Sequence, residues 1–424
     1  MKRFDRGTLL FFGVAIALIL IVQVLISLDL LGDFWNTLLR IGAVMAMVSI
    51  GLNLIYGFNG QFSLGQWGFY AIGAYTAADI TYRWSNSQSA SGLVIVLLIS
   101  LFVGLSFWAS SKLVTRARGL DALSTFFLYL ILSILAVIIA VFIGRILINP
   151  ISSFLVMLPA WLSMQIVFVI AVLLAGVLSA EVSYLFGLPV LTLGSDYFGI
   201  ATLGFTIIVK VLLDNSDTMF GFVEMKGARG MIGIPKIGSW LWIAFFLMVV
   251  IVITRNLLQS SSGRAIVSVR EDELAAKAMG IDVANQKIFT FVLGSLFAGL
   301  AGGLYAHING FLHPNTFNFI KSFDPLIIVV FGGLGSISGT IFASFAWAFV
   351  LEGVLRLVLP QGFETWRFVV YPLLLLVMML LRPAGLLGGF EFPYLRQILP
   401  PLPKKLQKQS TEQPSQVEEA SAGD

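Results

Sequence analysis

Long apolar runs separated by short polar stretches organise this chain. Ten runs reach the length of about twenty residues that a helix needs to cross a bilayer. They fall near residues 8–31, 37–57, 92–114, 120–148, 161–186, 189–213, 238–258, 286–309, 340–359 and 366–382. Two further runs, 62–82 and 324–339, are shorter and glycine-rich, so each is a full span, a broken helix or a re-entrant segment. The pattern predicts an all-α integral membrane protein with about 10–12 transmembrane helices.

Composition narrows the class of protein further. Of 424 residues, 58% are hydrophobic and 11% are charged, and the mean hydropathy of +0.95 lies far outside the range of soluble domains. The net charge of +4 is too small for the clustered basic surface that nucleic-acid binding requires. The chain has no cysteine, which excludes disulfides, thiolate metal sites and a cysteine nucleophile.

The basic residues predict the orientation of the spans. If both glycine-rich runs cross the membrane, the basic groups at 2–6, 116–118, 255–287 and 404–408 all fall on one side. By the positive-inside rule that side is the cytoplasm, so both termini are cytoplasmic and the polar loop 214–238 lies outside. The first apolar run is longer than a signal peptide requires and no small-residue cleavage site follows it, so we expect a retained span.

The longest charged stretch between spans runs from Ser262 to Asp282. It predicts a helix of about ten residues, with acids at its start from Glu271 and a stop at Gly280. Lys277 follows Glu273 by four residues, the spacing of a helical ion pair. One narrow face of the helix carries Leu274, Ala275, Ala278 and Ile281, which suits insertion into a groove on a partner. A solvated connecting helix is the alternative.

Six motifs resemble one family when they are taken in order. They are GLNLIYGFNGQFSLGQWGFYAIGAY (51–75), GLPVLTLGSDYFGIATLGF (187–205), REDELAAKAMGID (270–282), GSLFAGLAGGLYAHINGFLHP (294–314), VVFGGLGSISG (329–339) and RPAGLLG (382–388). Together they resemble the LivM-type permease subunits of the branched-chain amino acid ABC importer family. The resemblance covers most of the chain, except about 116–181 and the tail after Pro400.

The resemblance implies the ABC importer permease fold and import of leucine, isoleucine and valine across the bacterial cytoplasmic (inner) membrane. It implies a second permease subunit of LivH type, two ATP-binding subunits and a periplasmic or lipid-anchored substrate-binding protein as partners, in contact with membrane lipid. The segment 259–287 is then the cytoplasmic coupling loop. The residues expected to dock the ATPase are Glu271, Leu274, Ala275, Ala278, Gly280 and Ile281.

The sequence gives this chain no chemistry of its own. It contains no GxxxxGK[ST] motif, so ATP and Mg are expected on partner subunits, and the chain is a transport subunit and not an enzyme. No cofactor is expected in it. Its two histidines, His307 and His313, have no companion cluster for metal or acid–base work, so no metal site is predicted.

Uncharged polar residues and glycines mark a candidate translocation pathway. Amides and hydroxyls at membrane depth are tolerated where they are packed in protein or line a wet cavity. The candidates are Asn53, Gly60, Gln61, Ser63, Gln66, Gly332, Gly333 and Gly335. For the glycines, close helix packing is an equally good explanation.

The remaining predictions concern domains and an alternative function. Residues 1–399 form the permease domain, in which about 116–181 is an inserted helical pair, and 400–424 form a disordered cytoplasmic tail. Glu352 and Arg356 are expected to pair as i,i+4 neighbours. A channel or secondary transporter for small neutral solutes such as urea, short amides or other amino acids is the alternative, although no row of intramembrane acids suggests a proton relay.

Overall fold

The structure is a computed structural model that describes residues 6–116, 122–191, 195–219 and 223–354. Beyond these ranges it describes positions 373, 376–377, 380–381, 385–387, 391–392 and 395. The predicted tail 400–424, and most of the predicted span 366–382, lie outside the described residues.

Nine long helices dominate the described chain. They are α1 (Arg6–Ser27), α2 (Asp33–Leu52), α3 (Gln66–Ser87), α4 (Ser91–Arg116), α5 (Ala122–Val156), α6 (Ala160–Val190), α7 (Ser195–Asp214), α9 (Trp240–Gln259) and α12 (Val283–Asn309). Eight candidate spans in the described residues are long and apolar enough to cross a membrane. The predicted fold class, a helical multi-pass membrane protein, is confirmed.

Shorter elements connect these helices. The helical ones are α8 (Ser216–Met219), α10 (Ser261–Glu271), α11 (Glu273–Ala278), α13 (Phe323–Gly332) and α14 (Ile337–Ala346). A π-helix, Asn53–Phe58, continues α2, and another, Trp347–Val354, continues α14. Four 3₁₀ turns lie at Val223–Met225, Gly227–Arg229, Pro314–Phe317 and Phe319–Ser322. Two short strands, β1 (Met231–Ile232) and β2 (Phe311–Leu312), pair antiparallel.

The two glycine-rich runs that the sequence left open have different structures. Most of the run 62–82 lies in α3, which begins at Gln66 and continues to Ser87 as one helix of 22 residues, buried along most of its length. Its modest hydropathy follows from that position, because protein and not lipid surrounds it. The run 324–339 is a broken helix, in which α13 ends at Gly332 and α14 begins at Ile337.

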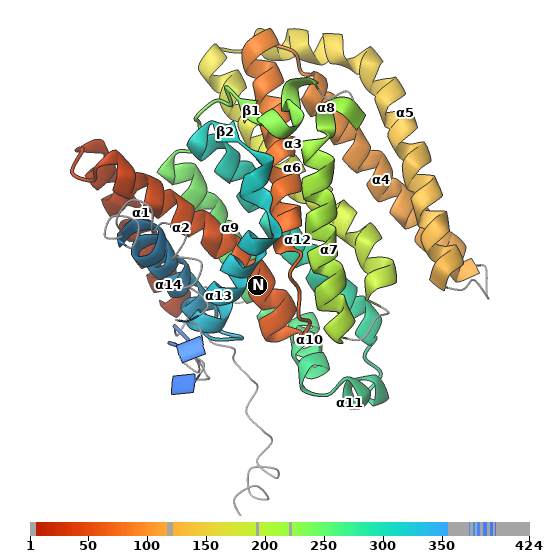
Figure 1. Ribbon diagram of the computed structural model, residues 1–424, viewed down its shortest axis with the longest axis vertical. Helices are drawn as coiled ribbons and strands as arrows, with labels where there is room; N and C mark the ends of the chain where they lie inside the picture. The colour runs from red at the N-terminus through yellow and green to blue at the C-terminus, as the bar shows by residue number, and fades with distance from the viewer. Residues whose placement is uncertain are drawn as a thin grey trace, which may run out of the picture.

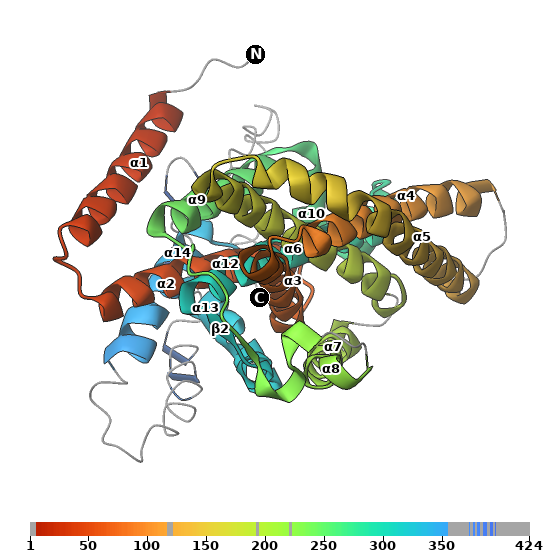
Figure 2. The same ribbon diagram turned by 90° about the horizontal axis from the view of Figure 1, so that it is seen from above.

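The core lies where α3, α6, α12 and α2 pack together, as Figure 2 shows in the middle of the molecule. Small residues make the crossings close. A Cβ added to Gly73 on α3 would lie 2.1 Å from the carbonyl oxygen of Gly299 on α12, and one on Gly51 would lie 2.6 Å from that of Gly294. At these two glycines the packing explanation therefore holds.

The predicted inserted pair is divided between the periphery and the centre. Helix α5 lies on the outside of the bundle beside α4 and exposes large apolar side chains such as Ile138 and Phe142, as a lipid-facing helix does (Figure 1). Helix α6 packs against α3 and α12. Of the two helices, only α5 is peripheral.

The bundle has two distinct ends (Figure 1). At one end, Met231 of β1 pairs with Leu312 of β2 beside α8, and we call this the β1–β2 end. At the opposite end α10 and α11 project below the helices, and we call this the α10–α11 end. Every element of the site described below is placed relative to these two ends.

Candidate transport site

Asn53 holds the break between α13 and α14. The side chain is 1% exposed, at the point where α2 passes into its π-helix. Its Nδ2 group donates to the carbonyl of Ser336 over 2.9 Å and to Oγ1 of Thr340 over 2.8 Å. Its Oδ1 atom accepts from the Gly335 N–H over 2.9 Å. A residue some 280 positions earlier in the chain therefore supplies the polar partners that the break needs.

The backbone of the break needs glycine at two positions. Gly333 has φ +114° and Gly335 has φ +79°, conformations that residues with a side chain adopt at a cost. Gly332 packs directly on α14, because a Cβ there would lie 2.5 Å from the carbonyl oxygen of Gly339. Local structure thus explains why glycine stands at all three predicted positions. Two of the glycines adopt the backbone conformation of the turn, and the third allows close packing.

The described residues after 384 complete the break. The N–H groups of Leu386 and Leu387 donate to the carbonyls of Phe331 and Gly332, over 2.8 and 3.3 Å, at the end of α13. The carboxylate of Glu391 accepts from the N–H of Ile337 over 2.5 Å at the start of α14. A carboxylate at a helix N-terminus complements the open N–H groups and the helix dipole. Sequence reasoning missed Glu391, whose role depends on a contact across more than fifty residues.

Arg270 connects this region to α10. Its Nη1 group donates to the carbonyl of Gly57 in the π-helix over 2.7 Å. A Cβ on Gly335 would lie 3.2 Å from the same Nη1 atom, so the guanidinium lies between the π-helix and the break. Motion of α10 would therefore reach both elements through one side chain. The sequence analysis did not single out Arg270.

The segment from Gly60 to Gln66 leads from the π-helix into α3. Gly60 has φ +78° and lies against Arg270. Ser63 Oγ accepts from the Gly65 N–H over 3.3 Å and is fully buried. Within the described chain, the buried amide of Gln66 and the Oε1 atom of Gln61 have no hydrogen-bond partner. Buried amides without protein partners are typical of positions that meet water or ligand.

The coupling segment differs from the single helix of about ten residues that the sequence predicts. Asp272 is extended, with φ −159° and ψ 111°, and separates α10 from the six-residue α11. Its Oδ1 atom accepts from the N–H groups of Leu274 and Ala275, over 2.8 and 3.0 Å, as an N-cap. Glu273 forms its ion pair with Lys287 on α12 and not with Lys277. The cap and the ion pair both follow from α11 turning back towards α12.

Helix α11 presents apolar side chains at the α10–α11 end. Leu274 is 81% exposed and Met279 is 83% exposed. Ala275 and Ala278 are exposed too, and Ile281 is half-buried. The predicted docking residue Glu271 is exposed at the last position of α10. Gly280 ends the turn with φ +81°, the left-handed conformation that the stop signal predicts. The predicted face is therefore open along most of its length.

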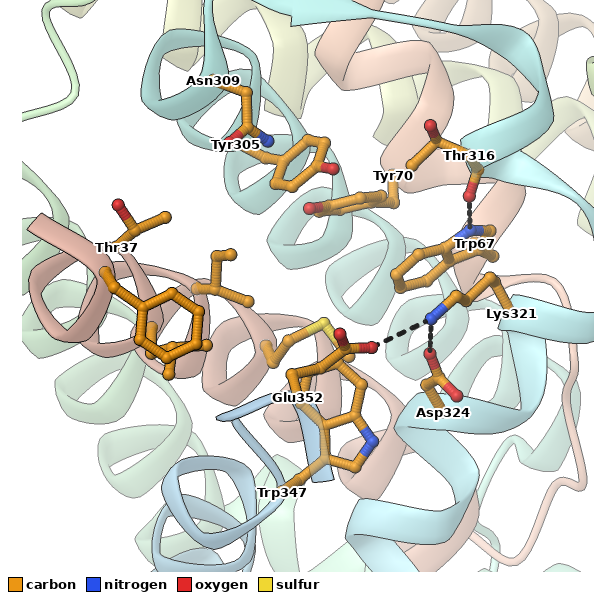
Figure 3. A pocket seen from close by; sticks show the side chains of 14 residues that line it. Thr37, Trp67, Tyr70, Tyr305, Asn309, Thr316, Lys321, Asp324, Trp347 and Glu352 are labelled. Atoms are coloured by element: carbon orange, nitrogen blue, oxygen red, sulfur yellow. Dashed lines mark hydrogen bonds and ion pairs between the residues drawn. The ribbon is translucent and has the colours of Figure 1, made fainter. Parts of the chain in front are cut away.

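A cavity of about 410 Å³ opens among α2, α3, α12, α13 and the π-helix after α14 (Figure 3). Its upper residues, Thr37 in the first turns of α2 and Asn309 at the end of α12, lie towards the β1–β2 end. Its walls are aromatic, with Trp67, Tyr70 and Trp347 among them. The volume lies within the range of small-molecule sites.

Three charged side chains gather at this cavity. Lys321 Nζ lies 3.1 Å from a carboxylate oxygen of Asp324 and 3.3 Å from one of Glu352 (Figure 3). Arg356, the predicted partner of Glu352, lies outside the described residues, and Lys321 and Asp324 were not among the predicted site residues. No sequence signal joins Lys321 to Glu352, because they lie 31 positions apart on different elements.

The predicted pathway candidates and the cavity occupy different levels of the molecule. Asn53 and the three glycines of the break gather near Gly57 and Arg270, towards the α10–α11 end. Gly60, Gln61, Ser63 and Gln66 lie along the adjoining segment. None of the eight predicted pathway residues lines the cavity. Trp67, which follows Gln66 directly, does line it. The cavity and the predicted pathway candidates are therefore two separate groups of residues in the structure.

Comparison with known proteins now decides the family. The sequence profile of the family described as "Branched-chain amino acid transport system / permease component" matches residues 151–379, which is more than half of the chain. The chain belongs to this branched-chain amino acid permease family. The resemblance seen in the six motifs is confirmed, and the matched range includes the helix break, α10, α11 and the charged side chains of the cavity.

Curated relatives in the permease family include LivM of Salmonella typhimurium, a high-affinity branched-chain amino acid transport system permease protein. It is 28% identical over 381 residues, which cover 81% of this chain and 68% of the relative. The BraD permease of Pseudomonas aeruginosa is 24% identical over 83% of this chain and 94% of its own length. LivH of Escherichia coli is 29% identical over 36% of this chain and 47% of its own length. No solved structure matches the chain.

Proposed function

We propose that this permease is the membrane-spanning subunit of an ATP-driven importer of leucine, isoleucine and valine. Membership of the permease family supports this proposal, as do the names of LivM and BraD, which describe branched-chain amino acid transport. The observation that supports the coupling mechanism is the exposed apolar face of α11. It lies next to Arg270, whose side chain contacts the π-helix after α2. ATP and Mg are held by two partner subunits, and the chain itself performs no chemistry.

The face of α11 is the docking surface for an ATP-binding subunit. Leu274 on α11 and Met279 directly after it are both more than four-fifths exposed, and exposed apolar side chains grouped on one short segment mark an interaction site. Ala275 and Ala278 leave room beside them for a groove wall to approach, and the left-handed turn at Gly280 fixes how far the helix projects. The α10–α11 end is then cytoplasmic, and the β1–β2 end faces the outside of the inner membrane.

Arg270 transmits movement of the docked helix to the transmembrane region. It donates to Gly57 over 2.7 Å and lies against the break at Gly335, so a shift of α10 displaces both together. Gly332, Gly333 and Gly335 form a bend that moves as a unit with Asn53. In this conformation the cavity faces outwards and the candidates from Asn53 to Gln66 form the closed inner side. Closure of the ATPases reverses this arrangement, as alternating access requires.

The other partners follow from the same role. A second permease of LivH type completes the membrane part, and part of this chain also aligns with LivH. A substrate-binding protein, periplasmic or lipid-anchored, delivers the amino acid to the outward-facing cavity. Lipid surrounds α5 and the other apolar surfaces.

The test is a charge placed on the docking face in the complete transporter. Ala275→Glu and Ala278→Glu each put an unpaired carboxylate where the ATPase must close, and burying an unpaired charge is strongly unfavourable. We expect loss of ATP-driven leucine uptake and of ATPase co-purification, with normal abundance in the membrane. Ala228→Glu is the matched control, because Ala228 is exposed at the opposite end of the molecule.

Two outcomes would contradict the proposal. Normal uptake by both α11 variants with the ATPases still attached would remove the docking assignment. Leucine uptake by wild-type vesicles that needs no ATP would favour a channel or secondary transporter. Parallel uptake of isoleucine, valine and urea tests the substrate class.

A further inference from the structure

The cavity combines opposite charges with an aromatic wall, and the mechanism above gives its individual side chains no role. The side chains of Lys321, Asp324 and Glu352 are 19%, 5% and 17% exposed. Charged groups held away from water lose hydration, and packed apolar residues would stabilise the same contact at least as well. The contact therefore adds little stability that apolar side chains would not supply, and all three charged residues line an open cavity.

The positions of the three groups suit a ligand that carries both signs of charge. Lys321 lies on the 3₁₀ turn before α13, Asp324 in the first turn of α13, and Glu352 on the π-helix after α14. A cationic group and a carboxylate thus face the cavity from different elements, separated by about 3 Å. A ligand with one ammonium and one carboxylate can exchange partners with this pair and leave the total charge unchanged. A cation alone would pair only with the two carboxylates, and an anion alone only with Lys321, whereas a zwitterion pairs with both kinds of group.

The remaining wall is rigid and largely apolar. The indole of Trp67 donates to the carbonyl of Thr316 over 3.0 Å and stacks on Tyr70 with ring centroids 4.7 Å apart. Tyr305 lies next to Tyr70, with centroids 5.4 Å apart, and Figure 3 shows both hydroxyl groups directed into the open space. Ile41 on α2 adds an aliphatic surface. The faces of these aromatic rings and Ile41 offer apolar surface on which a branched aliphatic side chain can pack.

We propose that this cavity is a binding site within the permease for the zwitterion of an α-amino acid with an apolar side chain. The α-ammonium group binds the carboxylates of Glu352 and Asp324, the α-carboxylate binds Lys321, and the side chain lies against Trp67 and Tyr70. The inference rests on the proposed importer function and adds to it: the permease itself selects for the amino-acid headgroup. Urea and short amides have no charges to match this cluster.

The experiment measures ligand protection of a cysteine in the complete transporter without its binding protein. The native chain has no cysteine, so Thr37→Cys at the cavity mouth is a single reporter, labelled by a membrane-impermeant maleimide. We expect L-leucine to slow its labelling. We expect no effect from 4-methylvaleric acid, which lacks the ammonium, or from 3-methylbutylamine, which lacks the carboxylate. Ala228→Cys, exposed on the same side but outside the cavity, is the control that no ligand should protect.

A second arm changes the site. In the Thr37→Cys background, Glu352→Gln should raise the leucine concentration for half-protection by roughly tenfold, the cost of losing a hydrogen bond to a charged group. Glu224→Gln removes a carboxylate from an ion pair away from the cavity, with Arg83 at 2.9 Å, and should leave protection unchanged. A merely structural Glu352 predicts instead that Glu352→Gln leaves the leucine concentration for half-protection unchanged. The comparison of leucine with the acid and the amine needs only the Thr37→Cys reporter and no change in the charged cluster.

Each outcome separates this inference from the importer function. Leucine uptake without protection of Thr37→Cys, up to the solubility limit of leucine, overturns the site and leaves the importer function standing. Protection by the amine alone overturns the zwitterion. Protection without ATP-driven leucine uptake supports the site and refutes the importer function.

Discussion

Replacing Asn53 with alanine should destabilise the protein, because Asn53 bonds to the break between α13 and α14 and not only within α2. The side chain makes three hydrogen bonds to the break, of 2.8 to 2.9 Å. Hydrogen bonds between membrane helices contribute about 0.6 kcal/mol each on average, so their loss amounts to about 2 kcal/mol. The loss is unequal, because the Ser336 carbonyl keeps two donors from Thr340. The Gly335 N–H loses the Asn53 oxygen that accepts its hydrogen bond, which adds about 1–3 kcal/mol.

The expected total is therefore about 3–5 kcal/mol of unfolding free energy. It is measured by denaturant titration of the purified transporter in mixed micelles, with the intrinsic fluorescence of this chain's tryptophans compared between variants. Asn256→Ala is the control, since Asn256 is exposed near the end of α9 and its replacement should change stability by less than about 0.5 kcal/mol. If Asn53→Ala were as mild as the control, the break would be held by its glycines and the segment after residue 384, and the role assigned to Asn53 would be wrong.

Three other predictions concern the α10–α11 end and the topology. Gly280→Val should cost about 1–2 kcal/mol of local stability. The cause is backbone strain alone, since nothing lies within 4 Å of an added Cβ, and the measurement is reduced co-purification of the ATPases. Arg270→Ala should keep the ATPases bound but reduce leucine uptake at least tenfold, whereas Arg264→Ala, on the same helix and exposed, should transport normally; equal uptake by the two variants would exclude Arg270 as the link. An impermeant reagent on intact cells should label a cysteine replacing Lys226 and spare one replacing Lys277, and the reverse result would invert the topology.

Much of the architecture follows from the sequence because its causes are local. Apolar runs of about twenty residues must be helical in a bilayer, where the backbone has to satisfy its own hydrogen bonds. The stop at Gly280 was predictable because a left-handed residue at a helix end favours glycine. The family was evident from six short motifs, which need no structure to be recognised.

Local signals were insufficient where two structures had similar local patterns. The runs 62–82 and 324–339 are both apolar and glycine-rich, yet most of the first lies in the continuous α3 and the second is broken after Gly332. What separates them is their surroundings: Asn53, Leu386 and Glu391 supply the break with partners from far along the chain. A backbone can leave the helix inside a membrane protein only where such partners exist.

Tertiary structure alone decided the charge pairs and the cavity. Spacing favoured Glu273 with Lys277, but Glu273 pairs with Lys287 because α11 turns back onto α12. Lys321 and Glu352 meet because α13 and α14 fold against each other at the break. Helical periodicity fixes which residues share a face within one helix, whereas pairing between helices depends on their packing, which the period of a single helix does not contain. The sequence therefore determined the spans, the turn at Gly280 and the family, and the packing of the helices determined which polar groups meet.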